Sequence, residues 1–301
     1  MAVITTGSHP KALWPGVKAW WGLSYNEHEV EYTKLFDSDT SSKHYEELVS
    51  LTGFSLGVVK PQGEPVSYAT NVQGFTTRAT HVTYGLGYIV TWEEMRDNLY
   101  EEVSKGRARS LAFSMRQTKE NVGAQVYNRA FSSSFVGGDG VALVSASHPN
   151  ISGGTFSNIQ TADLSEQALE DICIQIMGVE NDAGLKINLM PKSLIVPRQL
   201  WFDAHRLLMT TLQPDTASNN VNVIKATNAF PGGVVLNHYL TDTDAWFVRT
   251  NCPQGMTCFE REPIMFEQDN DFDTRNAKSH SIERYSFIWG DPRALFASAG
   301  V

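Results

Sequence analysis

The chain contains 301 residues, 42% of them hydrophobic, and its 33 acidic against 24 basic residues give a formal net charge of −9 at pH 7. This length permits two domains, or one large irregular domain, around a real apolar core. The acidic balance argues against sequence-independent nucleic-acid binding as the main task, because phosphate neutralisation requires clustered Lys and Arg. No window approaches the apolar length of a membrane span, and residues 1–11 lack the features of a secretory signal, so we expect neither.

Residues 1–60 have the character of an extended arm with short local structure. Trp14, Trp20 and Trp21 lie close together, beside prolines and glycines, in a segment with little periodicity. These side chains need burial, and two interpretations stay open. They pack onto the body of their own chain, or they pack beneath a neighbouring subunit, since aromatic residues are enriched in interface cores. Residues 42–49 predict a short helix.

Residues 61–90 are rich in Thr, Val, Tyr and Gly and predict an extended β-hairpin. Strand-like runs at 66–71 and 78–89 flank Gly74. Neither run alternates strongly enough to indicate a buried sheet face, which fits a hairpin that reaches away from the body. We expect Gly74 and Arg78 to lie near its tip or at its contact with a neighbour.

Residues 91–131 predict one long helix that no proline interrupts. Thr91 and Glu94 have the spacing of a capping box at its start. At about 1.5 Å per residue the run would span roughly 60 Å, which is too long for a compact domain and predicts an elongated subunit. Gly106 and Gly123 could bend it, so two shorter helices remain an alternative.

The side chains of this predicted helix are ordered by charge and by face. Acidic residues, Glu93 among them, fill its first half and basic residues follow, which is the order that the helix dipole favours. The basic cluster at 105–116 lies among acids, so a salt-bridged surface is the default interpretation and a nucleic-acid-facing strip the minority one. One helical stripe is formed by the apolar residues Met95, Leu99, Val103, Leu111, Met115, Val122, Val126 and Ala130.

Shorter helices and strands follow, so the predicted fold class is α+β. Helices are expected at 165–178 and 199–210, a strand ends at Pro197, and 213–220 is a polar loop. Further strands are expected at 221–224, 234–236, 245–250, 256–259, 264–268 and 281–289.

The chain carries no recognisable catalytic or nucleotide-binding motif. No GxxxxGK[ST], HExxH or GxSxG segment occurs. Asp269, Asp271 and Asp273 have the spacing of a calcium loop, but Phe272 and Thr274 stand where its glycine and further ligands belong. A calcium site there is therefore a minority interpretation.

The histidines and cysteines add no clear site. His148 stands before a proline in a Gly/Ser-rich loop, where turn geometry explains it better than catalysis. Cys252 and Cys258 have no second metal-binding pair nearby, and Cys173 falls in an apolar helical run, so reduced structural thiols are expected. We expect no cofactor, no metal and no enzymatic activity. The competing hypothesis of another class is a hydrolase that uses Asp and His residues of segment 240–280.

Several short segments, in one order along the chain, resemble a known family. The segments are YNRAF at 127–131, LVSASHPN at 143–150, GGTFSN at 153–158, LSEQALE at 164–170, LMPKSLIVPRQLWFDAHRLL at 189–208, NVN at 221–223, DAWFVR at 244–249 and WGDPRALF at 289–296. They are similar to the motif series of Mu-like major head subunits, which are major capsid proteins of tailed phages with the Hong Kong ninety-seven type fold. The resemblance covers roughly residues 90–301, and the collinear order is its strongest feature.

The resemblance implies an architecture of named parts. Residues 1–60 would be the N-terminal arm and 61–90 the extended loop. Residues 91–164 would form a peripheral domain with the spine helix, 165–250 the axial domain, and 251–301 the strands that return to the peripheral domain.

The implied function is that of a structural subunit, which forms hexameric and pentameric capsomers of an icosahedral shell around double-stranded DNA. Its implied partners are itself, a scaffolding protein, a portal and a decoration protein. The DNA would be contacted weakly, no membrane would be involved, and assembly would take place in the host cytoplasm before the subunit becomes part of the virion. The alternative within the same fold is the shell of a cellular nanocompartment.

The resemblance also implies interfaces between subunits. Some relatives link subunits covalently through a lysine on the extended loop, but no lysine occurs between Lys60 and Lys105, so we expect no such cross-link. No long scaffold-like segment precedes the arm, which implies a separate scaffolding protein. The residues expected at subunit interfaces are Trp14, Trp20, Trp21, Gly74, Arg78, Glu93 and Asp215.

Overall fold

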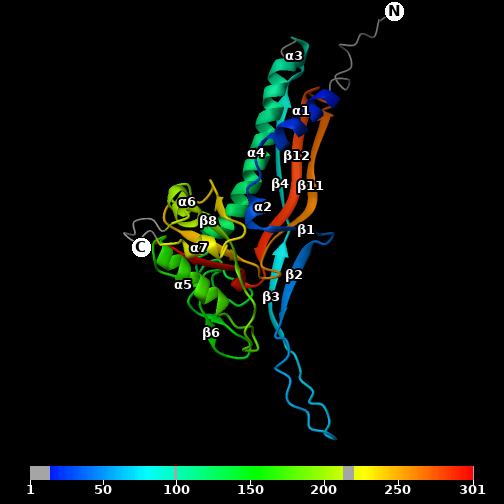
Figure 1. The fold of residues 1–301 in the computed structure, drawn as a ribbon. Helices are drawn as coiled ribbons and strands as arrows, with labels where there is room; N and C mark the ends of the chain where they lie inside the picture. The colour runs from blue at the N-terminus through cyan, green and yellow to red at the C-terminus, as the bar shows by residue number, and fades with distance from the viewer. Residues whose placement is uncertain (1–13, 98–99, 213–219, 301) are drawn as a thin grey trace, which may run out of the picture.

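The computed structural model describes residues 14–97, 100–212 and 220–300. The fold is α+β, as predicted, and it is elongated (Figure 1). A tall slab is formed by the long helix α4 and the strands β4, β11 and β12, and a second body that carries α5, α6 and α7 lies beside its lower part. The strands β2 and β3 lie beside the second body, and the connection between them extends below both.

A four-stranded sheet forms one side of the slab. Its order is β1-β11-β12-β4, with the bounds β1 Asp37–Thr40, β4 Val82–Val90, β11 Met256–Asn270 and β12 Ala277–Trp289. The strands expected at 256–259 and 264–268 are one strand, β11, whose pairing with β12 shifts register between Glu260 and Met265. Pro263 lies within this irregularity and has no N–H to donate, so a bulge accommodates it without ending the strand.

Helix α4, Tyr100–Asn128, lies along this sheet. The predicted run of 91–131 is divided, but neither Gly106 nor Gly123 divides it: a short helix α3, Trp92–Arg96, precedes α4. Thr91 Oγ1 accepts a hydrogen bond from the N–H of Glu94 at 3.4 Å, as the capping box predicts. The Glu94 carboxylate binds the Arg107 guanidinium of α4 at 2.8 Å and so ties the two helices together.

The first segment is helical where an extended arm was expected. It contains α1, Trp14–Glu27, and α2, Tyr32–Leu35, and α1 packs against α4. The helix predicted at 42–49 is wrong, because β2, Tyr45–Leu51, occupies this segment. Its partly buried side chains are Glu46, Leu48 and Ser50, and this period of two is that of a strand with one face on the body.

Strand β2 pairs antiparallel with β3, Gln73–Thr80, and residues 52–72 connect the two. The strand predicted at 66–71 is therefore wrong. The strand predicted at 78–89 is two strands in different sheets, separated by His81. His81 is buried and its ring hydrogen-bonds to Ser41 and Ser286, which fixes the chain where it passes from β3 to β4.

The second body is built on a five-stranded sheet of order β7-β13-β10-β8-β9. The helices predicted at 165–178 and 199–210 are confirmed as α5, Glu166–Met177, capped by Ser165, and α6, Trp201–Met209. The strand predicted at 221–224 is wrong: Asn222 accepts a hydrogen bond from the N–H of Lys225 and caps α7, Val223–Ala226. The remaining elements are β5 His148–Pro149, β6 Thr155–Phe156, β7 Ile159–Gln160, β8 Pro191–Val196, β9 Val234–Leu236, β10 Trp246–Thr250, a 3-10 turn Pro292–Ala294 and β13 Leu295–Ser298.

Strand β10 is the centre of this body, because both of its faces are buried. Trp246 and Val248 pack into the core beneath α5 and α6. Phe247 faces the other way and meets the Tyr127 ring of α4 edge to face, with centroids 5.3 Å apart. Arg249, buried on the same strand, pairs with Asp37 of β1 and so joins the second body to the slab. Among the described residues, no helix is both long and apolar enough to cross a membrane.

Replacing Phe247 by Ala is expected to lower the free energy of unfolding by about 3–5 kcal/mol, because a buried aromatic leaves a cavity at the junction of the two bodies. Phe272→Ala is the matched control: this ring is 95% exposed, so its removal should change stability by less than about 0.5 kcal/mol. Urea denaturation of the two variants checks the difference. Equal destabilisation would contradict the placement of Phe247 in the core.

Candidate assembly surfaces

The connection 52–72 is an apolar surface without cover in the subunit. Thr52 and Val72 close its base through a backbone hydrogen bond of 3.1 Å, and a turn joins Pro61 to Glu64. Beyond the base the segment extends away from both bodies (Figure 1). Large exposed apolar patches mark interaction sites in soluble proteins, and exposed apolar side chains gather along this segment. Here they are Phe54, Leu56, Val58, Val59, Val66, Tyr68 and Val72, with Tyr68 96% exposed.

Strands β2 and β3 pass close to the body at two of its glycines, Gly138 and Gly290, and this part of the hairpin is called its root here. A Cβ on Gly138 would lie 2.6 Å from the Thr76 carbonyl oxygen of β3. A Cβ on Gly290 would lie 2.4 Å from the Gln254 carbonyl oxygen and 3.0 Å from Leu48 of β2. Since Cβ atoms do not approach backbone oxygens so closely, β3 can lie in this position only with glycine at 138. A side chain at 290 would clash with the backbone of the body and crowd the Leu48 side chain of β2.

Two residues expected near the tip of the hairpin lie elsewhere. Gly74 is in β3 near the root, where a Cβ would lie 2.2 Å from Ile151 of the body. Arg78 is further along the same strand and pairs across to Glu47 of β2 at 2.7 Å, with its guanidinium 4.4 Å above the Tyr45 ring. A tip position is wrong for both, because the pairing partner of 73–80 is 45–51. A contact of Gly74 or Arg78 with a neighbouring subunit stays a prediction.

Lys60 lies within the exposed connection between β2 and β3. The hairpin predicted at 61–90 excluded Lys60, whereas the connection of the observed hairpin, residues 52–72, includes it. The absence of a covalent cross-link stays a prediction.

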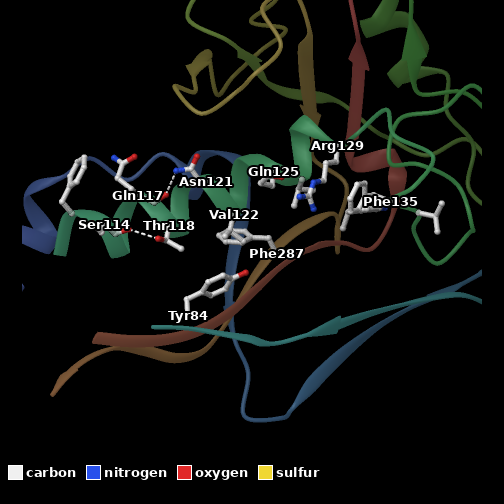
Figure 2. A pocket seen from close by; sticks show the side chains of 14 residues that line it. Tyr84, Ser114, Gln117, Thr118, Asn121, Val122, Gln125, Arg129, Phe135 and Phe287 are labelled. Carbon is white, nitrogen blue, oxygen red and sulfur yellow. Dashed lines mark hydrogen bonds between the residues drawn. The ribbon is translucent and has the colours of Figure 1, made fainter. Parts of the chain in front are cut away.

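A groove of about 830 Å³ lies between α4 and the sheet. Figure 2 shows its floor and walls, with Tyr84 and Phe287 from the sheet on one side and the row Gln117, Asn121 and Gln125 of α4 on the other. Exposed aromatic rings lie at its two ends, Phe113 on α4 and Phe135 after it; each is more than 40% exposed. Such a lining combines apolar contact area with amides that can bond to a peptide backbone.

Of the remaining residues expected at interfaces, the structure describes the side chains of Trp21 and Glu93. Trp21 packs onto its own subunit, stacked between Tyr25 and Phe266 with ring centroids 5.3 and 5.4 Å away. Glu93 is exposed in α3. Asp215 and the side chains of Trp14 and Trp20 lie outside the described residues.

The Asp and His residues of segment 240–280 do not converge on one site. Asp242 lies beside the C-terminal end of α4, where Thr241 N–H binds Asn128. Asp271 lies at the opposite end of α4, in the β11–β12 turn, where Lys278 binds it at 2.7 Å and lowers the pKa of its carboxyl. In the ranges that the structure describes, no three His, Cys, Asp or Glu side chains are placed to hold a metal ion.

His148 has a structural network that its sequence context did not indicate. It is buried, with Nδ1 2.6 Å from Asp139 Oδ2 and Nε2 3.1 Å from Asn158 Oδ1. Asn158 in turn donates to the carbonyl oxygens of Leu143 and Leu295. The network therefore fixes the loops that support the root of the hairpin.

The fold is similar to that of solved virus-like and phage particles. The chain matches a virus-like particle from Pyrococcus furiosus with a TM-score of 0.52 at 12% identity, over 94% of this chain and 97% of that chain. It matches a chain of Mycobacterium phage Adephagia with a TM-score of 0.54 at 11% identity, over 91% of each, and one of Mycobacterium phage Che8 with 0.51 at 11%, over 90% and 91%. At these identities the similarity establishes the fold. No curated protein matches.

The family model of the phage capsid protein matches residues 74–298, well over half of the chain. The chain belongs to this phage capsid protein family, and its role is that of a structural capsid subunit.

Replacing Gly138 by Ala is expected to leave the subunit folded but to displace the β2–β3 hairpin, because the added Cβ has no space beside Thr76. Closed particles should then be lost. Gly106→Ala is the matched control, since a Cβ at this exposed position of α4 meets nothing within 4 Å. Negative-stain microscopy of both variants, with circular dichroism to establish folding, checks this; normal particles from Gly138→Ala would contradict the role of the root.

Proposed function

We propose that this subunit is the major capsid protein of a tailed phage and forms the hexamers and pentamers of an icosahedral head around double-stranded DNA. The observation that carries the proposal is the pair of uncovered surfaces on one subunit: the apolar connection 52–72 and the groove beside α4. Two different surfaces that complement each other form a head-to-tail contact between subunits. Such contacts close into rings, and capsomers are rings of this kind.

The proposed parts follow the structure. The extended loop is the β2–β3 hairpin with its connection, residues 45–80, in place of 61–90. The spine is α4 with β4, β11 and β12, and the axial domain is the body around β10. A scaffolding protein, a portal and a decoration protein complete the assembly in the host cytoplasm, and the Mu-like motif series supports a head subunit of that type.

A second same-fold function is the shell of a nanocompartment, since the Pyrococcus furiosus particle has this fold. The content of purified particles distinguishes the two. Double-stranded DNA inside supports the phage head, and a protein cargo without DNA supports the nanocompartment.

The double variant Phe54→Asp/Tyr68→Asp is expected to abolish particles, while the free energy of unfolding of the subunit, measured by urea denaturation, stays within about 0.5 kcal/mol of wild type because both side chains are exposed. In wild type, chymotrypsin should cut after these residues in free subunits and not in particles. Trypsin is unsuitable, because Pro61 follows Lys60.

Phe272→Asp is the control, because its ring is as exposed as that of Tyr68 but lies in the β11–β12 turn. It should assemble normally. If the double variant also assembles, or if chymotrypsin cuts free subunits and particles equally, the connection 52–72 is not an interface.

The free subunit should bind double-stranded DNA negligibly at moderate salt, because its net charge of −9 opposes the polyanion. Filter binding with two unrelated DNA sequences checks both affinity and sequence choice. Nanomolar, salt-resistant binding would contradict the function of a shell wall.

A further inference from the structure

A buried charge pair joins the middle of α4 to the sheet. Lys119 Nζ lies 3.4 Å from Glu283 Oε2 of β12 and 3.7 Å from Glu260 Oε1 of β11. The Lys119 and Glu283 side chains are 3% and 0% exposed, whereas that of Glu260 is 36% exposed. Both distances exceed the roughly 2.7–2.9 Å of a strong charge-assisted hydrogen bond. The ammonium is therefore shared between an interior and an accessible carboxylate.

The strand opposite Lys119 carries buried polar atoms without partners. Glu283 Oε1, Ser281 Oγ and Tyr285 OH make no hydrogen bond with the described residues. The three residues alternate along β12, so they lie on the same face, and each is fully buried. Native proteins seldom leave such groups unsatisfied, and a cluster of them calls for an explanation.

The other polar groups that face the pair are already engaged. Arg116 of α4 donates to the Tyr25 carbonyl oxygen at 3.2 Å and stacks on its ring. Glu120 accepts the N–H groups of Glu31 and Tyr32. The side chains that complete the surroundings are Tyr25 of α1, Tyr32 of α2, Cys258 of β11, and Tyr84 of β4 stacked on Tyr285.

Apolar packing flanks the pair on both sides along α4. Toward the N-terminal end, Leu111 and Met115 pack with Trp21 and Phe266. Toward the other end, Tyr127 belongs to the core around Phe247. A change confined to the pair therefore leaves both ends of the helix anchored.

We propose that Lys119, Glu283 and Glu260 form a proton-operated latch between α4 and the sheet. While Glu283 is ionised, Lys119 holds α4 to the interior strand β12. When Glu283 takes up a proton from water, the ammonium moves to Glu260, and the new O–H of Glu283 has Ser281 and Tyr285 oxygens on its own face as acceptors. The site gains one positive charge, and α4 is released from β12 at this point only.

The direction of the titration agrees with this geometry. Burial raises the pKa of Glu283, and the attraction of Lys119 opposes the rise only in part. A carboxyl whose pKa is higher in the folded than in the unfolded state destabilises the fold when ionised, above its folded pKa. When the pH falls through the folded-state pKa of Glu283, the carboxyl becomes neutral and this destabilisation disappears. The latch therefore opens without a loss of global stability caused by Glu283.

The test is a pH titration of the whole chain by infrared spectroscopy and hydrogen exchange. As the pH is lowered, wild type should gain a protonated-carboxyl band at pH values above the ordinary range of exposed carboxyls, because burial raises the pKa of Glu283. Over the same pH range, amide protection factors at 116–122 and 281–285 should fall by about tenfold, after correction for intrinsic exchange. Glu283→Gln should lack the band and show the low protection at every pH.

Two further variants keep the result decisive if Glu283→Gln fails to fold. Lys119→Arg keeps the charge and should keep the pH dependence. Glu267→Gln removes an exposed carboxylate of β11 and should behave as wild type. The proposal is overturned if wild type gains no carboxyl band, if the band persists in Glu283→Gln, which would assign the proton to another group such as Glu120, or if protection is independent of pH.

Discussion

The packing of α4 along the β11–β12 hairpin is the contact on which the rest of this subunit depends. The 29 residues of α4 span about 43 Å at the usual rise per residue, and no compact core could cover that length. The helix therefore belongs to two cores, one around Trp21 and Phe266 and one around Phe247. Gly123 lies against the Phe287 ring, where a Cβ would be only 3.3 Å away, so the helix approaches the sheet closely between them.

This arrangement explains why the other parts take the places they do. Helix α1 covers the upper part of α4, and the second body attaches at its lower end through Tyr127 and Phe247. The Arg249–Asp37 pair fixes the second body to the edge strand of the slab. The β2–β3 hairpin then starts from a rigid junction, because the glycine contacts at its root and the His148 network allow one direction.

Local patterns predicted the elements whose partners are close in sequence or whose ends have a cap. The apolar stripe of α4, the Ser165 cap of α5 and strand β10 are of this kind. Strand β2 was missed because YEELV suits an amphipathic helix as well as a strand, and its partner lies beyond a connection of residues 52–72. No local pattern carries that pairing. Since the boundaries of the hairpin depend on it, the tip position of Gly74 and Arg78 and the exclusion of Lys60 from the hairpin were wrong as well.

The polar middle of the α4–sheet contact was equally invisible in the sequence. In β12 the side chains of Ser281, Glu283 and Tyr285 face inward while Ile282 and Arg284 face outward, the reverse of what hydrophobicity alone predicts. Register decides this: β11 and β4 hold β12 from both sides and set which face meets α4. The burial of the Glu283 carboxylate is therefore a consequence of strand pairing, and the Lys119 ammonium on α4 compensates its charge.

A shell made of such subunits gains its stability from number and not from any single contact. The connection 52–72 has no core of its own, so ordering it against a neighbour costs conformational entropy. This cost offsets part of the roughly 25 cal/mol that each buried apolar square ångström contributes. One such contact between two free subunits is therefore weak. In the ring that we propose, each subunit would both give a loop and receive one. Release of a subunit would then require two contacts to break together, and the effective concentration of each partner would be high. The same weakness of the single contact permits misplaced subunits to leave before closure.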